Sequence, residues 1–162
     1  MDCTFTKQSS KVARSTGESM DCNRLKFIVM GDPVGKGRPR FVRSTGIIYT
    51  PKKTKDYEKK CGQAAWVAMT KNKLECFEGN CSVKILAFLR VPKSWSKKKT
   101  LEAHLGKVIP TLPDVDNIAK SVLDGMQKIV FKDDKQIFHL EVTKRYCDED
   151  TEPQVQVEVF WQ

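Results

Sequence analysis

Carboxylates gather in the segment PDVDNIAKSVLDGM, at positions 113–126. Asp114 and Asp116 stand one residue apart near an expected helix start, and a second pair, Asp133–Asp134, precedes an expected strand. If folding brings carboxylates from the two elements together, they form the kind of oxygen ligand set that suits Mg²⁺. Lys120, one helical turn after Asp116, could then stabilise negative charge on a phosphate. The pattern favours metal-assisted hydrolysis of a phosphodiester.

A purely structural interpretation of these residues is equally open on spacing alone. Asp114 and Asp116 could cap the helix and complement the positive end of its dipole, which is worth about 0.5–2 kcal/mol. Asp116, Lys120 and Asp124 recur every four residues and could form a ladder of ion pairs. A calcium-binding loop is excluded, because the positions after DVDN lack the required oxygen ligand, glycine and glutamate.

The positive charge of the chain is unevenly distributed. The formal net charge is +9 over 162 residues. Residues 33–60 hold nine Lys and Arg against two acidic residues, whereas residues 147–162 hold five acidic residues and no Lys or Arg. Such a field attracts polyanions, although it could also serve only to keep the surface soluble. It favours a nucleic-acid partner.

The glycine-rich loop GDPVGKGRPRF does not match a nucleotide-binding motif. Lys36 is followed by Gly37, where a Walker loop requires Ser or Thr, and Arg40 stands where a dinucleotide-binding loop requires its third glycine. The remaining functional interpretation is that basic side chains reach DNA phosphates and position the backbone. We predict DNA contacts for Lys36, Arg38, Arg40, Lys52, Lys53, Lys97, Lys98 and Lys99.

Cysteine usage and hydropathy indicate the compartment. The six cysteines form no C-x-x-C pair and only two histidines could assist them, so a structural zinc site is not expected. The first residues lack the apolar core of a signal peptide, and no run of about 18 apolar residues could span a membrane. We therefore expect reduced thiols and a soluble, cytoplasmic protein without membrane contact.

Hydrophobic periodicity divides the chain into a tail and one domain. Residues 1–23 are rich in Ser and Thr without an apolar period, which predicts a disordered tail, and residues 24–162 form the domain. The expected elements are a hairpin around 43–50, helices over 51–71, 94–106 and 115–126, and strands over 25–30, 81–91, 136–146 and 154–161. This order predicts an α+β fold, with helices packed on a small mixed or antiparallel sheet.

Five segments together resemble the RusA family of Holliday junction resolvases. The resemblance runs in order from about residue 25 to the end of the chain. Its most specific parts are a D-x-D-N-x-x-K-x-x-x-D run that starts at Asp114 and a D-D-x-Q-I run that starts at Asp133. The segments are KGRPRF (36–41), YTPKKTKDYE (49–58), VPKSWSKKK (91–99), PDVDNIAKSVLDGM (113–126) and FKDDKQI (131–137).

The resemblance implies a homodimeric endodeoxyribonuclease of a bacterium or prophage. Such an enzyme makes paired symmetric nicks across four-way junction DNA in recombination and repair. It depends on Mg²⁺, for which Mn²⁺ can substitute, and it leaves a 5′-phosphate and a 3′-hydroxyl without a covalent intermediate.

The family pattern also assigns roles to single residues. It implies catalysis by Asp114, Asp116, Lys120 and Asp134, and metal binding by the three aspartates of this set. Asp124 and Asp133 match family positions too, and we expect them to support the site or the structure around it. Gly125 departs from the pattern, because a better helix former is expected at that position.

Two alternatives to a junction resolvase remain. The first is a Mg²⁺-dependent nuclease for flaps or other branched DNA. The second is a DNA-binding module without catalysis, in which the acids are only helix caps. The second alternative requires Asp134 to lie far from Asp114 and Asp116, so the separation of these carboxylates distinguishes it.

Overall fold

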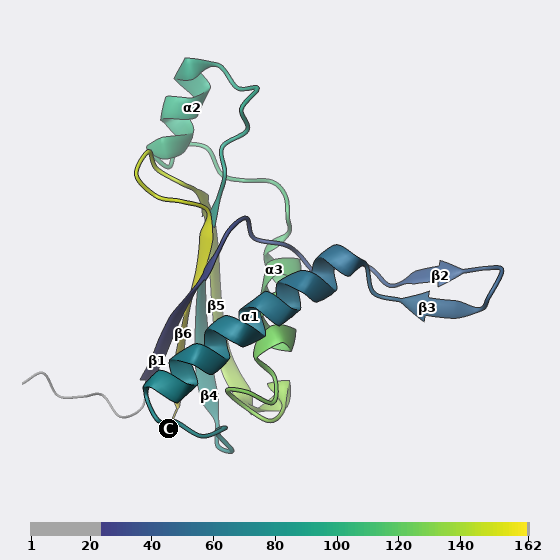
Figure 1. The fold of residues 1–162 in the computed structure, drawn as a ribbon. Coiled ribbons are helices and arrows are strands. Elements are labelled where there is room, and N and C mark those ends of the chain that lie inside the picture. Colours follow the sequence, from purple (N-terminus) through teal and green to yellow (C-terminus); the bar gives the residue numbers. More distant parts are fainter. Residues whose placement is uncertain (1–23, 162) are drawn as a thin grey trace, which may run out of the picture.

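The computed structural model describes residues 24–161 (Figure 1). Its elements are β1 (Arg24–Met30), β2 (Arg40–Val42), β3 (Ile47–Tyr49), α1 (Lys52–Lys71), β4 (Cys81–Leu89), α2 (Lys97–His104), α3 (Val115–Met126), a short 3₁₀ helix η1 (Asp134–Gln136), β5 (Ile137–Tyr146) and β6 (Gln154–Trp161). The predicted hairpin, helices and strands are confirmed within a few residues. The predicted tail, residues 1–23, lies outside the described residues.

Four strands form one mixed sheet in the order β1-β6-β4-β5. β6 runs antiparallel to both of its neighbours, whereas β4 and β5 are parallel. A parallel pair needs a long crossover, and the chain between β4 and β5 supplies one that contains α2 and α3. The sheet and its helices make a single α+β domain, which agrees with the predicted fold class.

Alternation along the strands determines which face of the sheet is buried. In β1 the residues Leu25, Phe27 and Val29 are buried while their neighbours are exposed, and in β6 buried valines alternate with half-buried polar residues. Helices α1 and α3 cover this buried face (Figure 1). Both helices supply apolar residues at helical spacing, which gives the core one layer of helices on one sheet.

The opposite face of the sheet carries a row of alternating charges. Lys26, Glu158, Lys84 and Glu141 are neighbours across four strands in the pairing register. Lys26 lies 3.0 Å from Glu158, and Lys84 lies 2.9 Å from Glu141. Cross-strand pairs of opposite charge stabilise a solvated face by only a few tenths of a kcal/mol each, about 0.2–1 kcal/mol. The same face also exposes Ile28, Met30 and Phe160, so the charged row crosses a surface that is partly apolar.

Gly125 lies where α1 crosses α3, which explains a residue that the sequence left unexplained. The helix continues through Gly125 to Met126. A β-carbon at position 125 would lie 2.6 Å from the carbonyl oxygen of Glu58 in α1, and one at Gly62 would lie 2.8 Å from the carbonyl oxygen of Gly125. The two glycines allow the helix backbones to approach more closely than side chains would permit.

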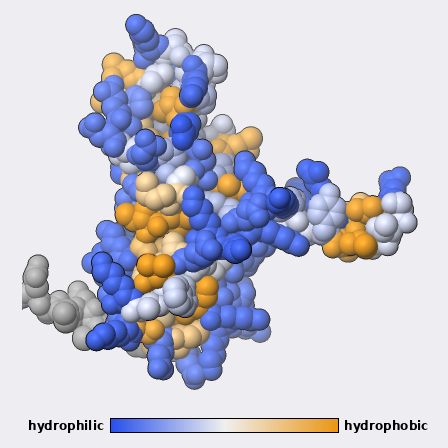
Figure 2. All heavy atoms as spheres, in the orientation of Figure 1, coloured by the Kyte–Doolittle hydropathy of each residue, from blue (hydrophilic) through white to orange (hydrophobic). Residues whose placement is uncertain are grey.

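The β2–β3 hairpin projects from the domain as an arm beyond the start of α1 (Figure 1). Within residues 24–161, β2 and β3 make substantial contact only with each other. Their apolar side chains are nevertheless exposed, namely Phe41 (61%), Ile47 (58%), Ile48 (69%) and Tyr49 (40%), and Figure 2 shows apolar surface on the arm. A lone two-stranded hairpin is marginally stable in water, so this arm is suited to a binding partner.

Candidate active site

The two aspartates of the DVDN motif lie at the first turn of α3. Asp114 is the N-cap residue, yet its side chain accepts no capping hydrogen bond from the helix backbone. Asp116 pairs with Lys120 at 3.3 Å, and the Lys120 and Asp116 side chains are 63% and 64% exposed. The predicted ladder ends there, because Asp124 bonds to Lys36 instead. Capping therefore does not account for the Asp114 carboxylate, which is exposed to solvent.

The glycine-rich loop is fastened to the start of α3. The backbone N–H of Lys36 donates to the carbonyl oxygen of Asn117 at 2.8 Å, and the buried Ser121 hydroxyl donates to the carbonyl oxygen of Val34. A β-carbon at Gly35 would lie 2.9 Å from the β-carbon of Pro113. The loop needs glycine here because it packs directly on the segment that carries Asp114.

A cavity of about 590 Å³ opens between this loop, the start of α1 and the start of α3. Its lining includes Arg40, Lys53 and Asp114. Within residues 24–161, Arg40 and Lys53 have no carboxylate partner in an ion pair. Two unneutralised cations and one open carboxylate therefore face the same hollow, which suits a phosphodiester held beside an acid.

Lys36 is held differently from its basic neighbours. Its ammonium bonds to Glu58 of α1 and lies 2.5 Å from Oδ2 of Asp124 in α3. Burial alone lowers the pKa of Lys36, but the hydrogen bonds that its ammonium donates to Asp124 and Glu58 outweigh this effect, so the pKa lies above that of an ordinary lysine. The charge of this predicted DNA-binding residue is thus already matched by two carboxylates of the same chain.

Asp134 lies in η1, beyond the far end of α3 from Asp114. The C-terminal part of β5 passes the start of α3, where Lys144 Nζ donates to the carbonyl oxygens of Thr111 and Pro113 at 2.7 and 2.8 Å. Asp134 immediately precedes the opposite end of β5. The twelve residues of α3 span about 18 Å at a rise of 1.5 Å per residue.

One chain therefore does not bring Asp134 together with Asp114 and Asp116. Within residues 24–161, no three His, Cys, Asp or Glu side chains are placed so that they could hold a metal ion. The predicted Mg²⁺ ligand set does not fit inside a single copy, because α3 and β5 run between its two halves.

Gln136, the glutamine of the D-D-x-Q-I run, fixes the turn that carries Asp134. Its Oε1 accepts the backbone N–H groups of Lys132 and Asp133, and its Nε2 donates to the carbonyl oxygens of Phe77 and Gly79. Asp133 accepts the N–H of Lys135, and this bond, followed by one with Asp134, lowers the pKa of the Asp133 carboxyl. Sequence reasoning overlooked Gln136, although its place in the motif was a usable signal.

The other predicted DNA-binding residues fall in two regions (Figure 1). Arg38 and Arg40 belong to the glycine-rich loop, with Arg40 also the first residue of β2, and Lys52 and Lys53 are the first residues of α1. Lys97–Lys99 form the first turn of α2, away from the arm, where Ser96 rather than Ser94 is the N-cap. Three lysines at the positive end of a helix dipole oppose helix stability, and Lys99 is partly accounted for within the fold, because its ammonium lies 3.9 Å from the centre of the Trp95 ring.

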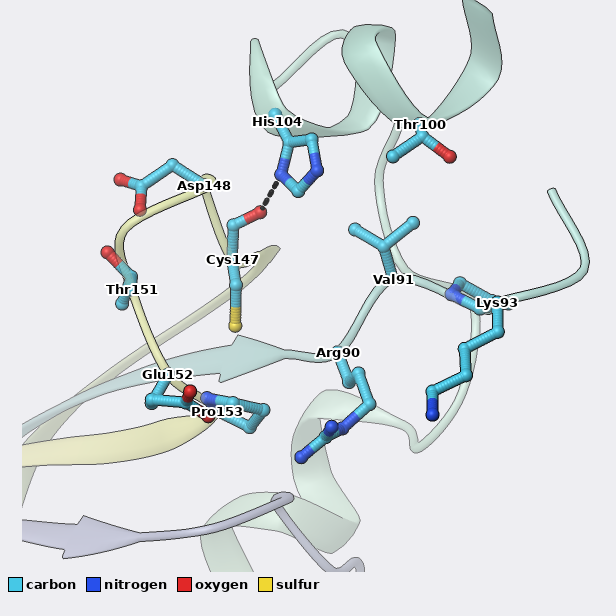
Figure 3. Close-up of a pocket in the computed structure, with 11 residues that line it drawn as sticks. Arg90, Val91, Lys93, Thr100, His104, Cys147, Asp148, Thr151, Glu152 and Pro153 are labelled. Carbon is cyan, nitrogen blue, oxygen red and sulfur yellow. Dashed lines mark hydrogen bonds between the residues drawn. The ribbon is translucent and has the colours of Figure 1, made fainter. Parts of the chain in front are cut away.

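A second hollow of about 420 Å³ lies where α2 meets the end of the sheet (Figure 3). His104 Nδ1 lies 2.7 Å from the carbonyl oxygen of Cys147, and both residues point into the space between α2 and the sheet. Arg90 and Lys93 share the lining with Asp148 and Glu152, so the charges largely balance. This hollow contains none of the residues predicted for catalysis, and its contacts attach α2 to the sheet.

Comparisons with known proteins agree with these motifs. The model of the family Endodeoxyribonuclease RusA matches residues 30–160. The chain is also 37% identical over 143 residues to "Uncharacterized protein YqaN" of Bacillus subtilis (strain 168), and the alignment covers 85% of this chain and 95% of that protein. None of the helices in residues 24–161 is long and apolar enough to cross a membrane.

Proposed function

Because the chain belongs to the RusA endodeoxyribonuclease family, we infer that it resolves Holliday junctions by paired symmetric nicks in DNA recombination and repair. Family membership already supports a hydrolase that cleaves DNA, and branched DNA as its substrate. The finer proposal rests on Asp114, whose side chain makes no capping hydrogen bond. Asp114 lies beside Asp116, at the edge of a cavity lined by Arg40 and Lys53.

The basic residues near this cavity provide for binding of the substrate. Between residues 33 and 55 the chain contains seven Lys and Arg and no acidic residue. The arm and the start of α1 would hold the sugar-phosphate backbone through such contacts, which carry affinity but little sequence information. The lysine turn of α2 would hold a second stretch of the same branched DNA.

We propose that two copies of the chain complete the catalytic carboxylate set. β5 is an edge strand, and Phe138 and Leu140 on it are 58% and 42% exposed, close in sequence to Asp134. A twofold axis beside the middle of α3 would place the Asp134 end of each copy next to the Asp114 end of the other. A twofold interface uses the same patch on both copies, so two identical sites form together, as paired nicking requires.

Mg²⁺ would be held by Asp114 and Asp116 of one copy and Asp134 of the other, and Mn²⁺ takes similar oxygen ligands. When bound, the ion supplies activation of water and stabilisation of charge on the phosphate oxygens. Lys120, which already contacts Asp116, would neutralise further charge on the phosphate. Asp124 would act indirectly, through its bond to Lys36. Asp133 would act indirectly as well, through the turn that carries Asp134. Hydrolysis would leave a 5′-phosphate and a 3′-hydroxyl.

Complementation between two inactive variants tests this arrangement. Asp116→Asn and Asp134→Asn should each fold, bind junction DNA without metal and fail to nick a synthetic four-way junction in Mg²⁺. If sites form between copies, mixed dimers contain one intact site, made of Asp114 and Asp116 from one copy and Asp134 from the other. Nicking of one strand per junction should then return after the two variants are unfolded and refolded together.

Other outcomes of this experiment would contradict different parts of the proposal. No recovery in verified mixed dimers would mean that the sites are not shared between copies. Wild-type nicking by either single variant would remove that residue from catalysis. An inactive wild-type protein that binds junctions tightly would favour the non-catalytic DNA-binding module, which the separation of Asp134 from Asp114 in one copy supports.

Substrate selectivity and DNA contact need separate measurements. Nicking rates on four-way junctions, flaps and forks under the same conditions would distinguish a resolvase from a general nuclease for branched DNA. Arg38→Ala and Arg40→Ala together should weaken junction binding and reduce the slope of log affinity against log salt by about 1–2. An unchanged slope would exclude this loop from the interface.

A further inference from the structure

We propose that Lys36 is a positioning residue that fixes the start of α3 against the loop leading to the arm, and that it does not contact DNA. The inference rests on the proposed nuclease function, because Lys36 would position the segment that carries Asp114 and Asp116. It changes the role predicted from sequence, which grouped Lys36 with the lysines that bind phosphates.

The side chain of Lys36 connects two helices. Its ammonium bonds to Glu58 of α1 and to Asp124 of α3, and only 27% of the Lys36 side chain and 20% of the Glu58 side chain are exposed. One positive charge is therefore shared between two negative ones. The cluster has no excess positive charge to offer a phosphate, and moving Lys36 toward DNA would leave two carboxylates facing each other beside the helix crossing.

The backbone of Lys36 is held at the same place. Its N–H donates to the carbonyl oxygen of Asn117, three residues after Asp114, and Gly35 packs against Pro113 and Asn117. Next along the loop, the N–H of Gly37 donates to the buried hydroxyl oxygen of Thr54 in α1 at 3.1 Å. Main chain and side chain together therefore bind the loop to α1 and to the start of α3.

Lys53 provides a matched comparison. It lines the same cavity as Lys36 and carries the same charge, but within residues 24–161 its ammonium takes part in no ion pair. A lysine in that state releases counterions when it meets a phosphate, whereas a lysine already paired twice does not. Substitutions of the two residues should therefore differ in their effect on the salt dependence of DNA binding.

The experiment compares Lys36→Met with Lys53→Met in the full chain. Lys36→Met should leave the metal-free affinity for a four-way junction and its salt slope unchanged, and should lower nicking at saturating DNA at least about tenfold, the range seen when geometry is lost. Lys53→Met should reduce the salt slope by about 0.9 and should leave amide exchange at the start of α3 as in the wild type. Lys36→Arg should recover nicking, because a guanidinium can bond two carboxylates.

Amide hydrogen exchange gives a readout that does not depend on activity. Lys36→Met should accelerate exchange in residues 34–37 and in the first turn of α3, and Lys53→Met should not. If the wild-type protein does not nick DNA, the proposed function fails, while this exchange comparison still decides the positioning role. Should Lys36→Met not fold, the double variant Lys36→Met with Asp124→Asn takes its place, because it removes one of the two carboxylate charges left facing each other.

Two results would overturn the proposal. One is a salt slope that falls in Lys36→Met as much as in Lys53→Met, which would make Lys36 a phosphate contact. The other is unchanged exchange at the start of α3 in a folded Lys36→Met protein, which would show that the two ion pairs position nothing there.

Discussion

The ammonium of Lys144 in β5 lies 2.8 Å from the carbonyl oxygen of Pro113, the residue before Asp114. The same ammonium donates a second hydrogen bond, to the carbonyl oxygen of Thr111 at 2.7 Å, so it fixes the segment that leads into α3. One lysine on an edge strand thus joins the sheet to the turn that carries Asp114.

Replacing Lys144 by Met should therefore loosen the turn that carries Asp114. Two charge-assisted hydrogen bonds are lost, but the site is partly exposed, so we expect about 1–2 kcal/mol of destabilisation. Urea denaturation measures it, with Lys84→Met as the control, because Lys84 makes only an exposed ion pair on the far face of the sheet. Equal effects in the two variants would contradict a special role for Lys144.

Gly125→Ala should destabilise the protein although alanine is the better helix former. Alanine gains about 1 kcal/mol in helix propensity, but its β-carbon would stand 2.6 Å from both the Glu58 carbonyl oxygen and the β-carbon of Cys61. Forced separation of packed helices costs about 1–3 kcal/mol or more. We expect a net loss, measured by thermal and urea unfolding, and a gain in stability would mean that α1 and α3 can separate freely.

Gln136→Glu tests whether the glutamine of the D-D-x-Q-I run acts through its amide donors. Glutamate keeps an oxygen for the N–H groups of Lys132 and Asp133, but it presents a second oxygen to the carbonyls of Phe77 and Gly79. The lost bonds and the unpaired acceptors should cost about 2–4 kcal/mol at neutral pH. Stability should partly return at low pH, as the carboxyl becomes protonated. A pH-independent effect would exclude this explanation.

The ion pairs of Lys36 stabilise the folded protein, and this stabilisation should be lost at alkaline pH. Its folded-state pKa is raised above the ordinary value of 10.5, so the folded protein retains this proton more strongly than the unfolded chain does. The contribution is fully present below pH 10.5 and disappears as pH rises through the folded pKa. The difference in melting temperature between wild type and Lys36→Met should be constant from pH 7 to 9 and shrink above about pH 10.5. A melting-temperature difference that grows with pH would contradict a raised pKa of Lys36 in the folded protein.

Local patterns in the sequence predicted most of the fold. Strict alternation in Gln154–Trp161 and the apolar period of Val115–Met126 each reflect a single buried face, and a buried face is visible in the order of residues. These elements were found because burial acts on residues two, three or four positions apart.

The site was less predictable because it depends on distant contacts. Lys36 pairs with residues 22 and 88 positions away, and nothing near Lys36 in the sequence distinguishes it from Lys53. The separation of Asp134 from Asp114 likewise follows from the direction in which the chain leaves α3. The spacing of residues does not reveal that direction. Only the position of Asp114 and Asp116 at the start of a helix could therefore be predicted from the sequence.

The arm can change without affecting the rest of the domain. β2 and β3 contribute nothing to the buried cluster that holds the sheet and helices together, so residues 41–49, which leave Arg40 in place, can be altered with little loss of folding free energy. The hairpin beyond Arg40 is therefore a part of the domain that can be exchanged as a unit. If the arm holds DNA as proposed, grafting the hairpin of another family member onto this domain should change DNA binding and leave the folding of the domain intact.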